Sequence, residues 1–480
     1  MSISRRAVIS GLGAGLGAGL LGPVAARAQG VASARDLVQA AGLGGEVGFA
    51  VADLRSGLVL EEYNARKPLA AASTTKAITS LYALEHLGAG YRFATRLIAT
   101  GPVRGGVVQG DLVLAGGADP TLATDDLGDM AAALAKRGVR GVTGRFLVWE
   151  GAIPQAEAIA GDQPVHVGYN PAISGIILNY NRVHFAWKRA GGGYDLAMEA
   201  LGERYRPRAY TTAAKLANRK TPVYSYRAEG GKEVWTVAAG ALGKAGSRWL
   251  PVRQPAAYAG DVFQTLARAQ GVDLPAPRPV RSLPGGAELV AHASEALPGL
   301  LRDMMKYSTN ITAEAVGMTT SAARGANAAM GRSGAAMSSW LEARAGLRGV
   351  GFVDHSGLNQ KSRIAPADMV QALRVLGAPM GLRGLMKPFE LRDGQGRKIK
   401  GHPLRVDAKT GTLDFVSTLA GYLTAPDGTE LVFTIFTGDL ARRARSKDGE
   451  GGESGASGAW IKRSKILQSR LLERWGALYG

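Results

Sequence analysis

The stretch AASTTKAITSLYALEHL, residues 71–87, changes at Ser73 from a run of small residues to a helical pattern of apolar ones. Lys76 follows Ser73 by three positions, and residues i and i+3 share one face of a helix. A helix N-terminus also presents free backbone N–H groups and the positive end of the helix dipole. The stretch therefore has two interpretations: a polar helix start, or a serine nucleophile beside a lysine base.

The composition is that of a large globular chain with a basic surface. Its 480 residues are 46% hydrophobic and 20% charged, and the formal net charge is +19. The basic residues are spread along the chain, without the arginine-rich arm, zinc-finger spacing or aromatic stacking motif of a nucleic-acid-binding protein. We therefore expect no nucleic acid as partner, and a surface that favours peripheral contact with an anionic membrane or an acidic polymer.

The first residues predict an export signal. Arg5 and Arg6 precede a weakly apolar Gly/Ala/Leu run, and Ala26-Arg27-Ala28 is a small-x-small cleavage pattern. The paired arginines are typical of a twin-arginine signal, and a general secretory signal is the alternative. We expect residues 1–28 to be removed and the mature protein to act outside the cytoplasm, in the periplasm.

The residue types exclude several kinds of chemistry. The chain has no cysteine, which rules out thiol catalysis, Cys-ligated zinc and iron–sulfur clusters. Its six histidines form no metal-ligand spacing, and no serine lies in a G-x-S-x-G elbow. We expect no metal and no cofactor.

Two more short motifs follow the S-x-x-K of Ser73 along the chain. Ser308-Thr309-Asn310 is the only S-x-N and lies at the break between two predicted helices. About one match is expected by chance for each of these two motifs, but only about a tenth of a match for Lys409-Thr410-Gly411. This K-T-G begins a predicted strand, where its glycine allows close backbone approach. The order of the three motifs and their positions make coincidence a poor explanation.

The set S-x-x-K, S-x-N and K-T-G resembles that of the serine penicillin-recognising enzymes. Ser73 and Ser308 are 235 residues apart (308 − 73), much further than in single-domain β-lactamases, which indicates inserted domains. This spacing resembles the D-alanyl-D-alanine carboxypeptidase/endopeptidase family of low-molecular-mass penicillin-binding proteins. The stretches GDLVLAGGADPTL, NPAISGIILNYNRV and VDHSGLNQKSRIAP extend the resemblance over nearly all of the mature chain.

The resemblance implies an α/β fold with a β-lactamase/transpeptidase-like catalytic domain, an antiparallel sheet flanked by helices, and smaller inserted domains. The predicted units are the export signal (1–28), the catalytic domain (29–90 and 287–480), an inserted domain (91–187 and 255–286) and a small β-rich inserted domain (188–254). The Pro/Gly-rich stretch 276–286 is interpreted as a connector.

The resemblance also implies a role for each motif residue. Ser73 would attack the carbonyl carbon of the penultimate D-alanine, with neutral Lys76 as its base. Burial and the nearby cation of Lys409 would both lower the pKa of Lys76. Ser308 would relay a proton to the leaving group, and Asn310 would hold the peptide and steady Lys76.

The K-T-G strand would bind the end of the substrate. Thr410, Gly411 and Thr412 are the predicted substrate-binding residues, and Lys409 with the two threonines would meet the terminal carboxylate. The backbone N–H groups of Ser73 and Thr412 would form the oxyanion hole, which stabilises the charge of the tetrahedral intermediate.

Two further features match the family less specifically. Glu150 occupies a place where the family has an acidic residue on the inserted domain, so it would meet the free amine of a diamino acid in the stem peptide. A solvated carboxylate at a strand end is an equal alternative. The loop Asp354-His355-Ser356-Gly357-Leu358 matches a D-x-S-G-L pattern that we interpret as structural support for the site.

The expected activity is that of a peptidoglycan D,D-carboxypeptidase, with D,D-endopeptidase activity on cross-links as a second reaction. The partners would be stem peptides and cross-links, with β-lactam antibiotics as covalent inhibitors. The first alternative is a serine β-lactamase, which would need an added base for rapid deacylation. The second is a non-catalytic cell-wall scaffold of the same fold, which would need none of the motif residues.

Overall fold

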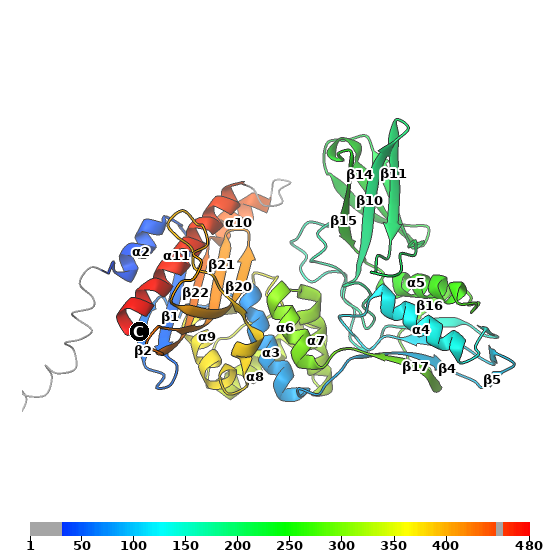
Figure 1. Ribbon diagram of the computed structural model, residues 1–480, viewed down its shortest axis with the longest axis horizontal. Coiled ribbons are helices and arrows are strands. Elements are labelled where there is room, and N and C mark those ends of the chain that lie inside the picture. Colours follow the sequence, from blue (N-terminus) through cyan, green and yellow to red (C-terminus); the bar gives the residue numbers. More distant parts are fainter. Residues whose placement is uncertain (1–30, 448–454) are drawn as a thin grey trace, which may run out of the picture.

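The computed structural model describes residues 31–447 and 455–480, which form two bodies that lie side by side (Figure 1). One body contains both ends of the described chain, and the middle of the chain forms the other. The predicted export signal at residues 1–28 lies outside the described residues.

A six-stranded antiparallel sheet forms the centre of the first body, in the order β19-β20-β21-β22-β1-β2. Its strands are β1 (Glu46–Asp53), β2 (Val59–Tyr63), β19 (Lys387–Pro388), β20 (Arg405–Leu413), β21 (Val416–Thr424) and β22 (Glu430–Gly438). All nine residues of β21 are buried, because helices cover both faces of the sheet. The pairing of β1 with β22 joins the two ends of the chain into one domain.

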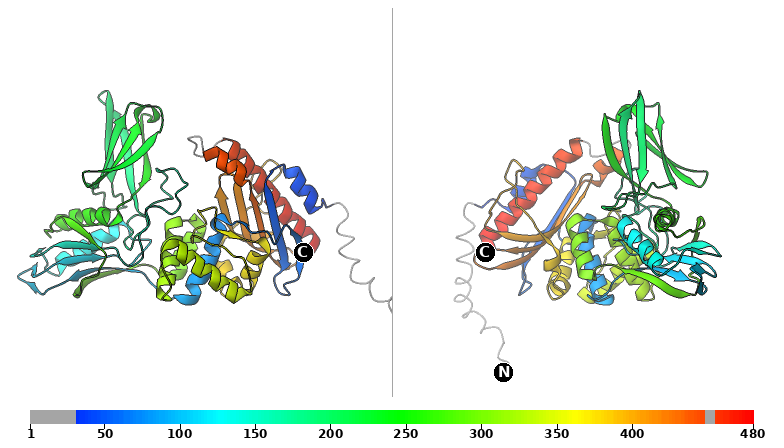
Figure 2. Two further views of the ribbon diagram at one scale, coloured as in Figure 1. Left: turned by 180° about the vertical axis from the view of Figure 1, so that it is seen from behind. Right: turned by 45° about the vertical axis from the view of Figure 1, so that its right-hand side comes forward.

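The helices lie on both sides of this sheet (Figure 2). One face is covered by α11 (Gly455–Tyr479) and the short α2 (Ala34–Ala41), and Trp460 and Trp475 of α11 enter the core there. The other face carries a helical layer: α3 (Thr75–His86), α6 (Leu297–Tyr307), α7 (Asn310–Ala323), α8 (Met330–Ala345) and α9 (Pro366–Ala372). Residues 75–83 of α3 are all buried, so α3 is the centre of this layer.

The second body begins with a five-stranded sheet in the order β16-β9-β7-β4-β17. Its elements are β4 (Ala94–Ala99), β7 (Leu112–Ala115), β9 (Phe146–Trp149), β16 (Pro277–Val280) and β17 (Ala287–Ala293), with α4 (Thr124–Lys136) and α5 (Pro255–Ala269) packed together beside them. The helices and strands bury a separate hydrophobic core that includes Phe146 and Phe263.

The pairing in this sheet corrects two predictions. Residues 277–280 lie in the predicted connector 276–286, yet they form β16, a parallel partner of β9. Pro277 and Pro279 are tolerated because β16 is an edge strand and one of its sides needs no donor. The boundary at residue 287 also fails, since β17 pairs with β4 of the inserted sheet.

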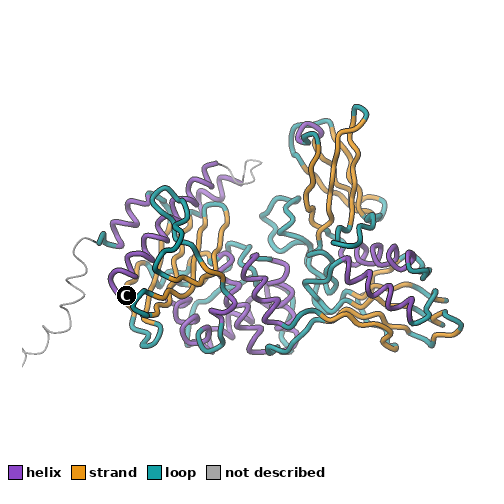
Figure 3. Tube along the Cα trace, viewed as in Figure 1, coloured by secondary structure: helices purple, strands orange, loops and turns teal. Residues whose placement is uncertain are grey.

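The β-rich module consists of two three-stranded sheets, β11-β10-β15 and β12-β14-β13. The strands are β10 (Arg182–Ala190), β11 (Gly193–Glu199), β12 (Thr212–Ala217), β13 (Tyr224–Glu229), β14 (Lys232–Ala238) and β15 (Ala245–Pro251). Strands dominate the module, as Figure 3 shows. The predicted boundary at residue 188 falls inside β10, because the alternation of apolar and polar residues already begins at Arg182.

A long irregular segment, residues 150–181, runs from β9 of the inserted sheet to β10 of the β-rich module and packs against the catalytic body. Ile153, Ile159 and Ile173 of this segment share a hydrophobic core with the helices of the catalytic domain. Arg253 stabilises the segment by donating to the backbone oxygens of Glu157, Val165 and Asn170 at 2.7–3.0 Å. The segment is thus held firmly beside the catalytic helices.

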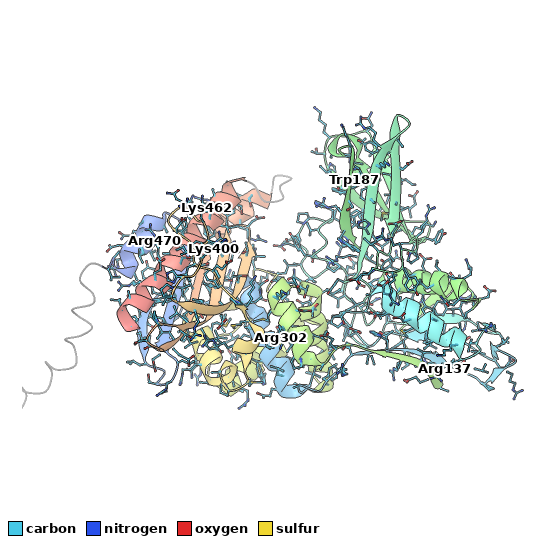
Figure 4. All side chains as sticks on the ribbon, in the orientation of Figure 1. Arg137, Trp187, Arg302, Lys400, Lys462 and Arg470 are labelled. Carbon is cyan, nitrogen blue, oxygen red and sulfur yellow. The ribbon has the colours of Figure 1, made fainter. Side chains whose placement is uncertain are left out.

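Exposed basic side chains are distributed over both bodies. Figure 4 labels Lys400, Lys462 and Arg470 at the face with α11, Arg302 on α6, and Arg137 at the far end of the inserted sheet. Within the described ranges, no helix combines the length and apolar character needed to span a membrane.

Candidate active site

Ser73 lies in a short 3-10 turn (Ala72–Thr74) that leads directly into α3. The Lys76 Nζ donates to Ser73 Oγ at 2.9 Å, so the i, i+3 spacing brings the two side chains into contact. Ala72 adopts a φ of 45°, which is unusual for a residue with a side chain. The serine is therefore presented on a strained turn at the start of a buried helix.

The S-x-N motif forms the second wall of the site. Helix α6 ends at Ser308, which adopts a left-handed conformation (φ 59°, ψ 36°), and α7 begins at Asn310. Asn310 Oδ1 accepts a hydrogen bond from Lys76 Nζ at 2.8 Å, and its Nδ2 donates to the backbone oxygen of Tyr169 at 3.0 Å. The break between the helices thus points both motif side chains towards the lysine pair.

The K-T-G strand β20 forms the third wall. Lys409 Nζ donates to Ser308 Oγ at 3.0 Å and to the backbone oxygen of Thr410 at 2.7 Å. A Cβ atom on Gly411 would lie 2.7 Å from the backbone nitrogen of Ser73 and 2.2 Å from Thr418 Oγ1. Glycine is therefore required where the strand passes the nucleophile. Thr412, one residue further, is exposed.

The structure thus brings five predicted residues together in one cluster, in which Ser73, Lys76 and Asn310 form one set of hydrogen bonds and Ser308 and Lys409 form a second. Its members, from three distant parts of the chain, are Ser73, Lys76, Ser308, Asn310 and Lys409. The half-buried Thr410, the tightly packed Gly411 and the exposed Thr412 follow Lys409 on the strand.

Burial dominates the electrostatics of the two lysines. It lowers the pKa of Lys76 to about 7, while the carboxylates of Asp354 and Glu314 oppose this shift. Burial also lowers the pKa of Lys409 well below its usual range, and the charge of Lys76 adds to that effect. The two lysines therefore interact as like charges. Because like charges in one buried site oppose each other, the site favours a state in which only one of the two lysines is protonated.

The D-x-S-G-L loop, residues 354–358, contacts Lys76 and the turn that carries Ser73. The backbone oxygen of Ser356 accepts a third hydrogen bond from Lys76 Nζ at 2.8 Å. Gly357 has a φ of 71°, and a Cβ there would lie 1.8 Å from the backbone oxygen of Ala72. The loop therefore packs directly against the strained turn that carries Ser73.

Sequence reasoning missed Glu314, which is fully buried on α7. Its carboxylate accepts from the backbone N–H groups of His355 and Ser356 at 2.8–3.2 Å. The available signal was its spacing: Glu314 follows Asn310 by four residues, which places both on one face of α7.

Glu150 follows β9 in the inserted sheet, and no hydrogen bond among the described residues joins it to the cluster around Ser73. It is 7% exposed, yet its Oε2 atom has no hydrogen-bond partner within those residues. Burial raises the pKa of Glu150, and hydrogen bonding from Gln155 and the charge of Arg281 oppose this. The solvated carboxylate offered as an alternative is not what the structure contains. Among residues 31–447 and 455–480, no group of three or more His, Asp or Glu side chains is arranged to hold a metal ion.

A family model described as the D-Ala-D-Ala carboxypeptidase 3 (S13) family matches residues 32–453, which include all three motifs and the inserted segments. The chain belongs to this family. The D-alanyl-D-alanine carboxypeptidase of Actinomadura sp. (strain R39) is 30% identical over 433 residues, covering 81% of this chain and 77% of that protein. The D-alanyl-D-alanine carboxypeptidase DacB of Haemophilus influenzae is 24% identical over 439 residues, covering 85% and 90%.

A solved structure gives the same result for the fold of this S13 family member. The crystal structure of penicillin-binding protein 4 (dacB) from Haemophilus influenzae matches with a TM-score of 0.74 at 21% identity, covering 90% of this chain and 98% of that one. The predicted family, the α/β penicillin-binding fold with inserted domains, and the class of serine-type D-Ala-D-Ala carboxypeptidase are confirmed.

Proposed function

We propose that this protein is a peptidoglycan D-alanyl-D-alanine carboxypeptidase that works through an acyl-enzyme on Ser73. The observation that carries the proposal is the 2.9 Å contact between Ser73 Oγ and the buried Lys76, whose pKa burial lowers to about 7. A lysine is a general base only when neutral, and a pKa near the working pH is the best value for that role.

In the proposed reaction Lys76 Nζ takes the proton of Ser73 as Oγ attacks the carbonyl carbon of the penultimate D-alanine. The C–N bond then breaks, and the terminal D-alanine leaves as its amine after receiving a proton through Ser308. Lys409 Nζ donates to Ser308 Oγ, which orients the Ser308 hydroxyl for this transfer. Water then attacks the ester on Ser73 and releases the shortened peptide, with the serine regaining its proton.

Three features support the proposed mode of substrate binding. Lys409, with Thr410 and the exposed Thr412 on the same strand, offers donors to the terminal carboxylate. The close approach of Gly411 to the Ser73 nitrogen brings the proposed oxyanion donors of the strand and the turn together. The unpartnered Oε2 of Glu150 suits the free amine of a diamino acid in the stem peptide.

Export to the periplasm, with D,D-endopeptidase activity on cross-links as a second reaction, belongs to the same proposal. The paired arginines and cleavage pattern of residues 1–28 support export. The net charge of +19 favours peripheral contact with an anionic membrane or the wall. Binding of β-lactams is supported by a crystal structure of the Haemophilus influenzae protein in complex with a β-lactam.

The test is intact-protein mass spectrometry after incubation with a penicillin, with Ser73→Ala as the comparison. We expect one stable adduct on the wild type, none on Ser73→Ala, and release of D-alanine from a D-Ala-D-Ala peptide by the wild type alone. Rapid penicillin hydrolysis without an adduct would favour the serine β-lactamase. An intact wild-type protein with neither adduct nor hydrolysis would favour the scaffold.

A further inference from the structure

Two residues of helix α7, one helical turn apart, fix the position of Lys76: Asn310 directly and Glu314 through a loop. Asn310, at the start of the helix, accepts directly from Lys76 Nζ at 2.8 Å. Glu314, four residues later, accepts from the backbone N–H groups of His355 and Ser356, and the backbone oxygen of Ser356 accepts from the same Nζ at 2.8 Å. The orientation of the lysine thus depends on Glu314 through a loop that the carboxylate binds.

A second carboxylate fixes the other half of that loop. Asp354 is fully buried and accepts from Gly357 N at 3.0 Å, Asn359 N at 2.8 Å and Ser362 Oγ at 2.5 Å. The two carboxylates together bind backbone N–H groups at four positions between residues 355 and 359. These contacts fix the path of the loop that presents the Ser356 oxygen to Lys76.

Resting on the proposed role of Lys76 as base, we infer that Glu314 and Asp354 are positioning residues that aim the Lys76 amine and set, by their charge, the pH at which it becomes neutral. Neither carboxylate touches the nucleophile, so both act through the loop and through the electric field at Nζ. Among the described residues, the charged groups that interact with them are Lys76 from α3 and each other, and His355 of the loop donates its backbone N–H to Glu314.

The charge balance of this buried group makes the inference specific. When Lys76 is neutral, two ionised carboxylates would leave two uncompensated charges in the interior, which is costly. Burial and the charge of Asp354 raise the pKa of Glu314 to about 8, so Glu314 and Lys76 take up protons over the same range as the pH falls. His355 does not take up a proton in this range, because burial lowers its pKa to about 3. Lys76 and Glu314 therefore titrate as a coupled pair.

The chain offers a matched control in the β-rich module. Glu233 on β14 is 1% exposed, accepts from the backbone N–H groups of Arg253 and Gln254 at 2.7–3.0 Å, and has a pKa that burial raises to about 7. It has the same chemistry as Glu314, but among the described residues it has no hydrogen bond or charge interaction with Lys76. A purely structural effect of losing a buried carboxylate would be shared by both residues.

The experiment is the rate of acylation of the mature full-length protein by a chromogenic penicillin, measured from well below to well above pH 7. We expect the wild type to lose activity towards acid in two overlapping steps, because two groups share the protons. Glu314→Gln removes the negative charge and keeps the shape, so its acid limb should be a single step about one pH unit lower. Glu233→Gln should keep the wild-type acid limb.

An acid limb of folded Glu314→Gln that coincides with that of the wild type overturns the inference, whatever happens to the maximal rate. Absence of acylation of the wild type at every pH would instead overturn the proposed function, which distinguishes the two failures. If circular dichroism shows that Glu314→Gln does not fold, Asp354→Asn carries the same expectation, since the charge of Asp354 also raises the pKa of Lys76. An unmoved acid limb in folded Asp354→Asn again overturns the inference.

Discussion

The cluster around Ser73 and the region around Glu150 differ in the hydrogen bonding of their buried polar atoms. Lys76 is 0% exposed, and its Nζ donates to three oxygens, from Ser73, Asn310 and Ser356. Glu150 is nearly as buried, yet its Oε2 has no partner among the described residues. Preorganised donors and acceptors suit a reaction centre, whereas an unmet acceptor suits a site that a ligand completes. The comparison separates a catalytic region from a recognition region.

The largest expected effect comes from removing the Lys76 amine, which makes three hydrogen bonds in the cluster around Ser73. Lys76→Met keeps an apolar stem of similar volume but leaves Asn310 Oδ1 and the Ser356 oxygen without their donor. We expect acylation by penicillin to fall about a thousandfold, the usual range for losing a general base. Stopped-flow or quenched mass spectrometry would measure it, with Lys215→Met of the β-rich module as a control that retains the wild-type rate. A loss below about tenfold would show that another group takes the serine proton.

A smaller effect is expected from crowding the strand against the nucleophile. In Gly411→Ala the new Cβ would lie 2.2 Å from Thr418 Oγ1 and 2.7 Å from the Ser73 nitrogen, so the strand or the turn must shift. We expect acylation to fall about a hundredfold, comparable to the loss of one oxyanion donor. Gly438→Ala on β22 is the matched control, because its nearest neighbour would be 3.7 Å away. Equal rates for the two variants would contradict the proposed place of β20 in the site.

The positions of the residues in the cluster around Ser73 were largely predictable from the sequence. The i, i+3 spacing of Ser73 and Lys76, the helix break at Ser308 and the strand at Lys409 each have local signals, and the structure unites them. Glu314 was not predicted, because its partners are backbone N–H groups of residues 355 and 356. Every residue type except proline has such a donor, so the sequence does not identify the pairing. A fully buried glutamate on a helix reads as an ordinary polar residue until its partners are known.

The limits of the inserted sheet were less predictable, and for a different reason. Pro277 and Pro279 signal a connector locally, and only the pairing of β16 with β9 makes them part of an edge strand. Similarly, residues 287–293 look like the start of the second catalytic segment, but β17 returns to pair with β4. Long-range strand pairing decided both positions, and local patterns do not encode it.

The smallest effect is expected at Glu150, whose Oε2 has no hydrogen-bond partner among the described residues. Glu150→Gln removes the charge but keeps an amide oxygen, so a site that binds a free amine should weaken only for substrates that carry one. For a D-Ala-D-Ala peptide with a free side-chain amine we expect kcat/KM to fall about tenfold, the value of one charge-assisted hydrogen bond. For the same peptide with that amine acetylated, and for penicillin, we expect a change below about twofold. An equal loss on both peptides would place Glu150 among residues that only support the fold. Because burial raises the pKa of Glu150, the preference for the free amine should strengthen as pH rises and the carboxyl group ionises.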